Sequence, residues 1–544
     1  SRVASISDGL PAPNGDNLVG TYLPGSVEIG VLMLEGFGSD QIAMRPAASL
    51  FQKAGAHIFT FDFSGHGRSS GGLGFDNAVT DRLAYQVLAA KEIFQEQSGL
   101  SSDQIILFGH SLGARVALQS AILDPQPPAA LVLLGTQVNL GINRQAAFFT
   151  GTNDGDLAWV QSLSAQIPKT DLLLLSGSWD DILTPEAAQA LQEKLLSGPN
   201  TVGSTYTRRL IIVPHLFHNY EIYSTSLLKQ AAAQLEDLTL LNFQGQISLI
   251  NYYLFGALTL LGLLGSITIL SLQQQQGILS LEQQQGILSL NQQQTQDSPA
   301  AQETSTRIID PKKFFKAKAI LWLAALPVAL LLTGLFFLLP LNLPVLNMIY
   351  GGFIGGYGML MLILYRRGKV PGTQGRLAFN SAQNPTTHFF KEDNFWIGLT
   401  LWMVILGVCI LFTRSGLFYV IPANQRLTWL LLFSPFTAIG FWIGDREASM
   451  LTIFRQETGR KLPWSNLMLS LIGLMPFILY AIVMGILGST SGMIGGLQGL
   501  LVLAIVLLTG KALKNFINQP WLIAILEAFL LYALVLPQGV LFAF

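Results

Sequence analysis

The sequence predicts two parts of different fold class: an α/β part with a mostly parallel sheet over residues 1–246, and an all-α polytopic membrane part after it. The first part alternates short apolar runs with helical stretches, which is typical of strands buried between helices. The second part contains apolar runs near the length of about 20 residues that a bilayer-spanning helix needs. The first part has 13 Lys and Arg against 22 Asp and Glu, and the second has 18 against 10.

Six apolar runs are the expected strands of the sheet: "VEIGVLMLEGFG", "HIFTFDF", "QIILFGHS", "ALVLLG", "DLLLLSG" and "RLIIVPHLFH". They are continuously apolar rather than alternating, as strands buried on both faces are. Stretches such as "AVTDRLAYQVLAAKEIFQEQ" and "PEAAQALQEKLL" lie between them and predict helices that cover the sheet. The excess of acidic residues argues against nucleic-acid binding, because that function needs cations to neutralise phosphates.

Eight apolar runs are the expected spans of the membrane part, and the fifth and seventh are short: 247–272, 319–340, 344–365, 395–413, 427–443, 466–488, 495–510 and 520–541. The predicted organisation is a domain over 1–246, a first span over 247–272, a linker over 273–311 and a multi-pass domain over 312–544. The Gln-rich linker repeats a nine-residue unit, and such low-complexity polar tracts do not bury enough surface to fold. Its Ile-Leu-Ser-Leu units could instead dip into the membrane interface.

The cations of the membrane part predict its orientation. Under one alternating topology, 16 of its 18 Lys and Arg residues fall on one side, which leaves only Arg414 and Arg426 on the other. Because cytoplasmic loops carry the excess of cations, residues 1–246 are expected on the extracytoplasmic face of a plasma or inner membrane. A signal peptide or anchor helix ahead of Ser1 would fit this orientation.

The segment "GHSLG", from Gly109 to Gly113, falls between an apolar strand and a helical stretch. At such a junction a G-x-S-x-G segment forms a tight turn that lifts the serine hydroxyl above the sheet. Glycines flank the serine because the turn leaves no room for side chains. The placement therefore predicts Ser111 as a nucleophile.

A nucleophilic serine needs a base, and the base needs an acid that orients it. Downstream, "LLLLSGSWDDILTP" offers Asp180 and Asp181, and "IIVPHLFHNYE" offers His215 and His218. Each of these residues follows an expected strand, at the edge where open α/β sheets place their sites. The order Ser, Asp, His predicts a catalytic triad with two candidates each for the acid and the base.

Residues 1–240 resemble the α/β-hydrolase family, and in particular monoacylglycerol-lipase-like and S33-type serine hydrolases. The resemblance rests on "GHSLG" and on "FDFSGHGRSSGG", from Phe61 to Gly72. It implies an α/β-hydrolase fold and a Ser-His-Asp acyl-enzyme mechanism. Only about 35 residues separate the strand that ends at Gly135 from the one that starts at Asp171, so we expect a minimal cap.

The resemblance also ranks the triad candidates. In this family the acid commonly lies three residues after a strand-ending glycine, which favours Asp180, whereas spacing back from Pro185 favours Asp181. The "NYE" that follows His218 favours this residue over His215 as the base.

Two backbone N–H groups should form the oxyanion hole, one after the nucleophile and one in the loop after an early strand. These positions are Leu112 and Phe37. The family usually has a histidine before Gly36, where this chain has Glu35. A carboxylate that faced a developing oxyanion would be unfavourable, so we expect the Glu35 side chain to point away.

These observations predict a membrane-embedded serine esterase that acts on a small-molecule or lipid-like ester at the bilayer. An amide bond, a short peptide or an acylated cell-envelope molecule are alternative substrates. The chain contains no metal-binding, phosphate-loop or dinucleotide motif, so no cofactor or metal is expected. A hydrolase fold retained only for binding is the competing interpretation of the same residues.

The number of spans suggests a second function class, because an anchor needs only one. Ionisable residues are nearly absent from the apolar runs, and Glu527 in the last run is the exception. A carboxyl at that depth is costly and marks a candidate functional site, unless it is protonated and hydrogen-bonded to a neighbour. The alternative is therefore a transporter or receptor-like membrane protein whose hydrolase domain is sensory or structural.

Overall fold

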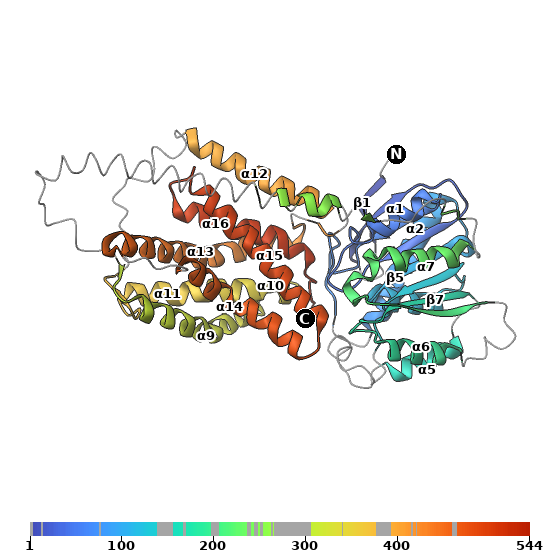
Figure 1. Ribbon diagram of the computed structural model, residues 1–544. Helices are drawn as coiled ribbons and strands as arrows, with labels where there is room; N and C mark the ends of the chain where they lie inside the picture. Colours follow the sequence, from blue (N-terminus) through green and yellow to red (C-terminus); the bar gives the residue numbers. More distant parts are fainter. Residues whose placement is uncertain are drawn as a thin grey trace, which may run out of the picture.

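The computed structural model describes most of the chain, in the following ranges: 4–11, 15–74, 78–138, 156–166, 170–196, 206–236, 241–243, 249–250, 254–259, 261–262, 265, 306–339, 341–376, 393–414, 417–419, 422–459 and 465–543. Of the predicted linker over 273–311, residues 273–305 lie outside the described residues. Most of the first predicted span, 247–272, also lies outside them. An α/β part and a helical part lie end to end (Figure 1).

The α/β part contains an eight-stranded sheet with the order β1-β2-β4-β3-β5-β6-β7-β8. Its strands are β1 (Ala4–Pro11), β2 (Asn17–Leu23), β3 (Gly30–Leu34), β4 (His57–Phe61), β5 (Ile105–His110), β6 (Ala130–Leu134), β7 (Asp171–Gly177) and β8 (Arg208–Val213). The pairs β1–β2 and β2–β4 are antiparallel and all other neighbours are parallel. The predicted α/β class is confirmed, with β1 and β2 as an antiparallel edge that the six predicted strands did not include.

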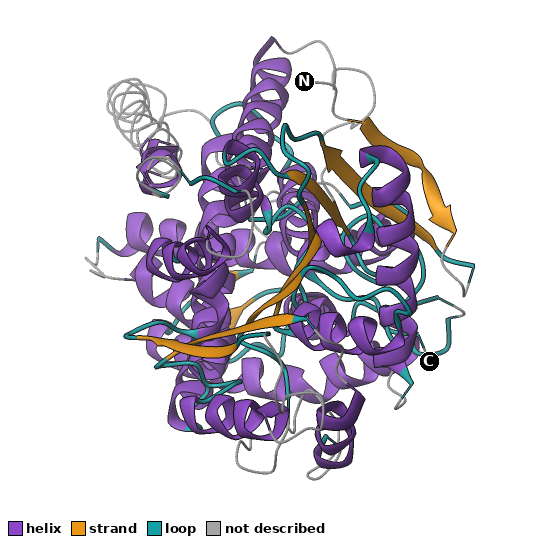
Figure 2. Ribbon diagram, turned by 90° about the vertical axis from the view of Figure 1, so that its right-hand side faces the viewer, coloured by secondary structure: helices purple, strands orange, loops and turns teal. Residues whose placement is uncertain are grey.

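Helices cover both faces of this sheet (Figure 2). They are α1 (Arg45–Lys53), α2 (Val79–Ser98), α3 (Leu112–Leu123), α5 (Leu157–Gln166), α6 (Pro185–Leu196) and α7 (Thr225–Glu236). Because neighbouring residues of a strand point to opposite faces, Leu32 and Leu34 pack with α2 and α3, whereas Val31 and Met33 pack with α1 and α7. Both faces are apolar, which explains why the strands do not alternate in the sequence.

The helical part follows the predicted apolar runs, with four helices longer than their runs and the last one shorter. Its helices are α9 (Pro311–Phe336), α10 (Val345–Tyr350), α11 (Gly356–Arg366), α12 (Asp393–Arg414), α13 (Gln425–Thr458), α14 (Ser465–Ile486), α15 (Thr490–Leu513) and α16 (Pro520–Val535). Among the described residues, six helices are long and apolar enough to cross a membrane. The third predicted run is instead a succession of α10, a π-helical turn over Gly351–Gly355 and α11.

Glycines bring three helices together around this π-helical turn. A Cβ on Gly352 or Gly356 would contact Ala329 of α9, and a Cβ on Gly358 would overlap the backbone at Gly440 of α13. Glycine at these positions lets the helix backbones approach closely, as small residues do in membrane bundles.

A buried polar cluster joins α9, α11 and α13. Lys318 forms an ion pair with Glu447, and its Nζ donates to the Tyr357 hydroxyl at 2.7 Å. The hydroxyls of Tyr357 and Tyr365 each donate to Glu447 Oε1 at 3.1 Å. Glu527 is the one ionisable residue inside the predicted apolar runs, and Lys318 and Glu447 lie just outside them. Hydropathy missed this pair because α9 and α13 extend beyond their apolar runs.

We predict that Lys318→Met lowers the free energy of unfolding of the full chain by about 3–5 kcal/mol, because it leaves a buried carboxylate without its cation. Unfolding in detergent micelles, followed by circular dichroism, measures this loss. The double variant Lys318→Met/Glu447→Gln should recover part of it. Equal losses in the single and double variants would contradict the ion-pair explanation.

The two parts meet through the extended segment 541–543, in which Phe542 forms isolated β-bridges with Leu73 and Leu343. Leu541 N–H donates to Gly65 O at 2.8 Å, Leu73 N–H donates to Leu541 O at 2.7 Å, and Ala543 N–H donates to Leu73 O at 3.0 Å. On its other edge, Phe542 exchanges two backbone hydrogen bonds of 2.9 and 3.0 Å with Leu343. The segment 541–543 is therefore hydrogen-bonded on both edges, between a loop of the α/β part and the start of α10.

Candidate active site

Ser111 lies at the turn between β5 and α3, with a φ of 54°. Non-glycine residues enter this left-handed region only where the surrounding structure holds them there. A Cβ on Gly109 would overlap the α3 backbone, and a Cβ on Gly113 would overlap the carbonyls of Leu34 and Glu35. The two glycines therefore permit the close backbone approaches that hold the serine in its strained conformation.

His218 lies between Ser111 and Asp180. Its Nε2 is 2.9 Å from Ser111 Oγ, and its Nδ1 is 2.9 Å from Asp180 Oδ2. The other carboxylate oxygen of Asp180 accepts the N–H groups of Ile182 and Leu183 at 2.7 and 2.8 Å. The serine, histidine and aspartate are all buried. With the imidazole proton on Nδ1, Nε2 can accept the serine proton, which is the arrangement of a nucleophile, base and orienting acid.

The two alternative triad candidates lie elsewhere. The Asp181 carboxylate accepts the Ser491 hydroxyl at 2.6 Å and the Ser491 N–H at 3.0 Å, at the start of α15. His215 is exposed, and its ring lies against Trp179 at a centroid distance of 4.9 Å. Neither residue has a hydrogen bond to Ser111 or His218 among the interactions of the described residues.

The predicted oxyanion loop passes close to the nucleophile. A Cβ on Gly36 would lie 3.3 Å from Ser111 Cβ and 3.0 Å from His110 Nδ1. Phe37 follows it, and Leu112 is the first residue of α3, next to the serine. The Glu35 carboxylate accepts the N–H of Phe63 at 3.0 Å. The loop thus brings a backbone segment against the serine and directs its carboxylate to another strand end.

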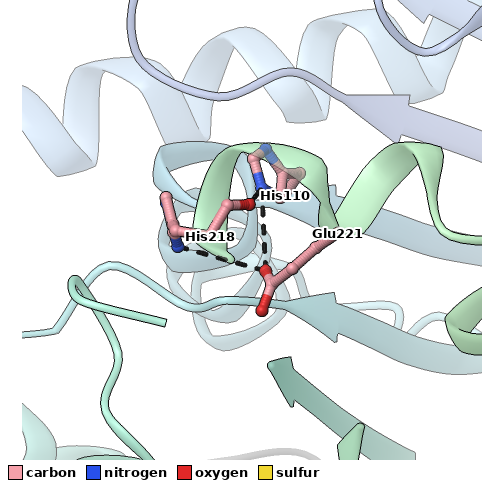
Figure 3. Close-up of side chains that lie close together, drawn as sticks. All are labelled: His110, His218 and Glu221. Carbon is pink, nitrogen blue, oxygen red and sulfur yellow. Dashed lines mark hydrogen bonds and ion pairs between the residues drawn. The ribbon is translucent and has the colours of Figure 1, made fainter. Parts of the chain in front are cut away.

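Two further side chains, His110 and Glu221, lie against the His218 imidazole (Figure 3). His110 Nε2 is 3.1 Å from the His218 carbonyl, and burial lowers the pKa of His110 to about 3, so it is neutral. Glu221 Oε1 accepts the Gly177 N–H at 2.7 Å, and its Oε2 is 4.0 Å from His218 Nδ1. Burial, reinforced by Asp180, raises the pKa of Glu221 well above its usual range. Its neutral form is therefore favoured, and Asp180 remains the partner of His218.

The segment "NYE" favours His218 as the base, but the sequence assigns no role to its last residue, Glu221. The spacing of three residues after the histidine was the available signal, because it places both side chains on one face of the helical turn His218–Tyr223. His110, His218 and Glu221 also have ligand atoms within 4.8 Å of one another, as a metal site requires. The hydrogen bonds to Asp180 and to the His218 carbonyl already engage both imidazoles, so this cluster is explained without a metal.

Glu527 lies in the helical part, buried between α15 and α16. A Cβ on Gly510 of α15 would overlap its carboxylate. Gly510 is close to the end of α15 that Leu513 terminates, whereas Ser491, which contacts the α/β part, is at the other end. Glu527 is therefore separate from the Ser111 site.

Known proteins match the α/β part. Residues 26–154 match the family model of the S33 serine aminopeptidases. An uncharacterized protein of Mycobacterium tuberculosis is 28% identical over 236 residues, which are 40% of this chain and 76% of that protein. A putative esterase/lipase of Mycoplasma genitalium is 31% identical over 140 residues, covering 24% of this chain and 48% of the relative. The structure of a Pyrococcus furiosus esterase matches 44% of this chain and 93% of its own, with 20% identity and a TM-score of 0.35.

The α/β part is an esterase-like serine hydrolase with the α/β-hydrolase fold. The predicted resemblance is thereby confirmed, as is the all-helical region that follows. The three relatives described above match 24–44% of this chain.

We predict that Asp180→Asn lowers kcat for a p-nitrophenyl ester by about 10⁴-fold, because the amide favours the wrong tautomer of the base. Asp181→Asn is the matched control and should keep most of the activity, since Asp181 contacts Ser491 instead. Steady-state kinetics of the two purified variants measure the difference. The opposite ranking would make Asp181 the acid.

Proposed function

We propose that the chain is a membrane-embedded serine hydrolase that cleaves an ester, or an amide, by a Ser-His-Asp acyl-enzyme mechanism. The observation that carries the proposal is the position of His218. Its Nε2 is 2.9 Å from Ser111 Oγ, and its Nδ1 is 2.9 Å from Asp180 Oδ2. The strained φ of Ser111 supports it further, because strain of this kind concentrates at functional turns.

In the first half of the reaction, Ser111 Oγ attacks the ester carbonyl while His218 Nε2 takes the hydroxyl proton. The N–H groups of Phe37 and Leu112 donate to the oxygen that becomes negative. Asp180 stabilises the imidazolium through Nδ1. The tetrahedral intermediate collapses as His218 returns the proton to the alkoxide, which leaves as an alcohol and leaves the acyl group on Ser111.

In the second half, a water molecule attacks the acyl-enzyme and His218 accepts one of its protons. The second tetrahedral intermediate releases the carboxylic acid as the proton returns to Ser111 Oγ. This sequence needs no cofactor, because the same imidazole passes the serine proton to the departing alcohol and a water proton to Ser111 Oγ.

We propose a lipid-like or acylated substrate that reaches the site from the bilayer. The contact of Asp181 with Ser491 puts the loop of the catalytic acid against the start of α15. Trp179, the residue before that acid, is half exposed, and its ring lies edge-on to His215 and tilted against Phe217 at centroid distances of 4.9 and 5.0 Å. Exposed aromatic side chains of this kind favour the boundary between headgroups and acyl chains.

The extracytoplasmic orientation of the hydrolase part has support from the positions of the cations. The helix ends that contact the α/β part include the end of α12 and the start of α13, which carry Arg414 and Arg426. The remaining cations of the helical part belong to its other end in the alternating topology. By the positive-inside rule, the α/β part is then outside the cytoplasm.

We predict that a fluorophosphonate probe labels the purified full chain, and that Ser111→Ala and His218→Ala each lose essentially all specific labelling. Removal of a triad member typically lowers the rate by about 10⁴–10⁶-fold. Labelling of the wild type that persists in Ser111→Ala would show a different nucleophile. A folded wild type that neither reacts with the probe nor hydrolyses esters would leave the hydrolase fold as a binding module.

We predict that Glu527→Gln leaves kcat and KM for ester hydrolysis unchanged, because Glu527 lies near the end of α15 that is remote from Ser491. The same variant tests the transporter alternative. If it abolishes movement of a solute into vesicles and leaves ester hydrolysis intact, the helical part has a transport function of its own.

A further inference from the structure

Arg426 is a fully buried cation at the start of α13, and it joins the two parts of the chain. Its Nη2 donates to the carbonyls of Gly65 at 2.6 Å and Gly539 at 2.8 Å, and its Nε donates to Leu536 O at 3.2 Å. A single guanidinium therefore holds a loop of the hydrolase against the segment that follows α16. Burial of an ionised side chain costs several kcal/mol unless it is paired, so its presence at this junction requires a compensating charge.

Glu35 is one of the buried acidic groups around the guanidinium. Burial, reinforced by Asp62 and Asp40, raises the pKa of its carboxyl well above the usual range, while Arg426 acts in the opposite direction. Glu35 Oε2 and Arg426 Nη1 both lack a hydrogen-bond partner within the part of the chain that the structure describes. The buried carboxyls of Asp40 and Asp62 also lie within electrostatic range of the guanidinium. The buried cation of the helical part therefore lies among three buried acidic residues of the hydrolase part.

The contacts of this junction continue to the predicted oxyanion residue. Gly65 O, which accepts from Arg426, also accepts the Leu541 N–H at 2.8 Å. The ring of Phe542 lies against the ring of Phe37 at a centroid distance of 6.0 Å.

The ring of Phe37 also lies near the loop that Arg426 contacts. His66 follows Gly65, and its ring is 6.3 Å from the Phe37 ring. The Glu35 carboxylate accepts the Phe63 N–H at the start of the same loop. The Phe37 ring therefore contacts both a hydrolase loop and the segment 541–543, and Arg426 contacts the backbone at Gly65 in that loop and at Gly539 just before that segment.

We propose that Arg426 and Phe542 are positioning residues for the oxyanion hole, so that the helical part is a working component of the hydrolase. The inference rests on the proposed function of the Ser111 site. A donor N–H stabilises the oxyanion only when it lies within hydrogen-bonding distance of the position that the oxygen takes in the transition state. A shift of the Phe37 backbone would therefore lower kcat and leave binding of the ground-state ester nearly unchanged.

The test compares Arg426→Gln, Arg426→Lys, Phe542→Ala and Phe542→Leu in the full chain, purified in detergent. Arg414→Gln is the matched control, because this exposed arginine is at the same end of the helical part. For each variant we would measure kcat and KM with p-nitrophenyl butyrate, the rate of fluorophosphonate labelling of Ser111, and the midpoint of thermal unfolding.

Arg426→Gln and Phe542→Ala should lower kcat by about 10–100-fold, less than or comparable with the loss of an oxyanion donor, with KM nearly unchanged. Arg426→Lys and Phe542→Leu should retain more activity than the other two variants, because they keep the charge and the apolar contact respectively. Adding Glu35→Gln to Arg426→Gln should restore part of the loss, since it removes the carboxyl that the guanidinium compensates. Arg414→Gln should match the wild type.

The inference is overturned if Arg426→Gln and Phe542→Ala fold and turn over the ester at the rate of the control. If Arg426→Gln does not fold, Phe542→Ala decides, because it removes only a ring contact. A rise in KM with unchanged kcat would make the junction a substrate-binding surface and would also overturn it. If the wild type neither hydrolyses esters nor reacts with the probe, the proposed function itself is overturned. If the wild type and the variants are all equally active, only the inference about Arg426 and Phe542 is overturned.

Discussion

The site and the junction both depend on the parallel arrangement of the central strands. Parallel strands bring all their carboxyl ends to one edge of a sheet, and the loops that leave that edge must share one space. In this protein the ends of the membrane-type helices lie against the same edge. Each loop therefore has two neighbours to satisfy, the reaction centre on one side and the helical part on the other.

The two adjacent aspartates after β7 contact the reaction centre and the helical part from one loop. Asp180 is hydrogen-bonded to the candidate base, while Asp181 is hydrogen-bonded to Ser491 at the start of α15. The loop after β3 has the same division, with Gly36 beside the nucleophile turn and Glu35 within electrostatic range of Arg426. A change in the helical part can therefore reach the site through only one or two residues of a loop.

The helical part contains buried charged side chains in two regions, at the junction with the α/β part and inside the bundle. At the junction, the Arg426 guanidinium donates hydrogen bonds to carbonyls of two segments that are far apart in the sequence. Deeper in the bundle, Lys318 and Glu447 join helices that the apolar runs alone would not have linked. Both arrangements satisfy polar groups internally, which a chain must do wherever water cannot reach. They set the relative position of the helices more narrowly than apolar packing could.

The residues alone determined the fold class of both parts, because continuously apolar runs, strand-to-helix junctions and spans of bilayer length are local patterns. They also named Ser111, Asp180, Asp181, His215 and His218 as candidates, because strand ends and short motifs can be located in a sequence. Only the tertiary structure brought His218 between Ser111 and Asp180 and directed Asp181 to Ser491. Adjacent carboxylates are equivalent in a sequence, and the direction of each side chain depends on what packs against its loop.

The pairing of Arg426 with the loops around Glu35 and Gly65 was also beyond the sequence, since 361 positions separate the arginine from Gly65. Contacts over that separation depend on how two independently patterned parts dock, and hydropathy carries no information about docking.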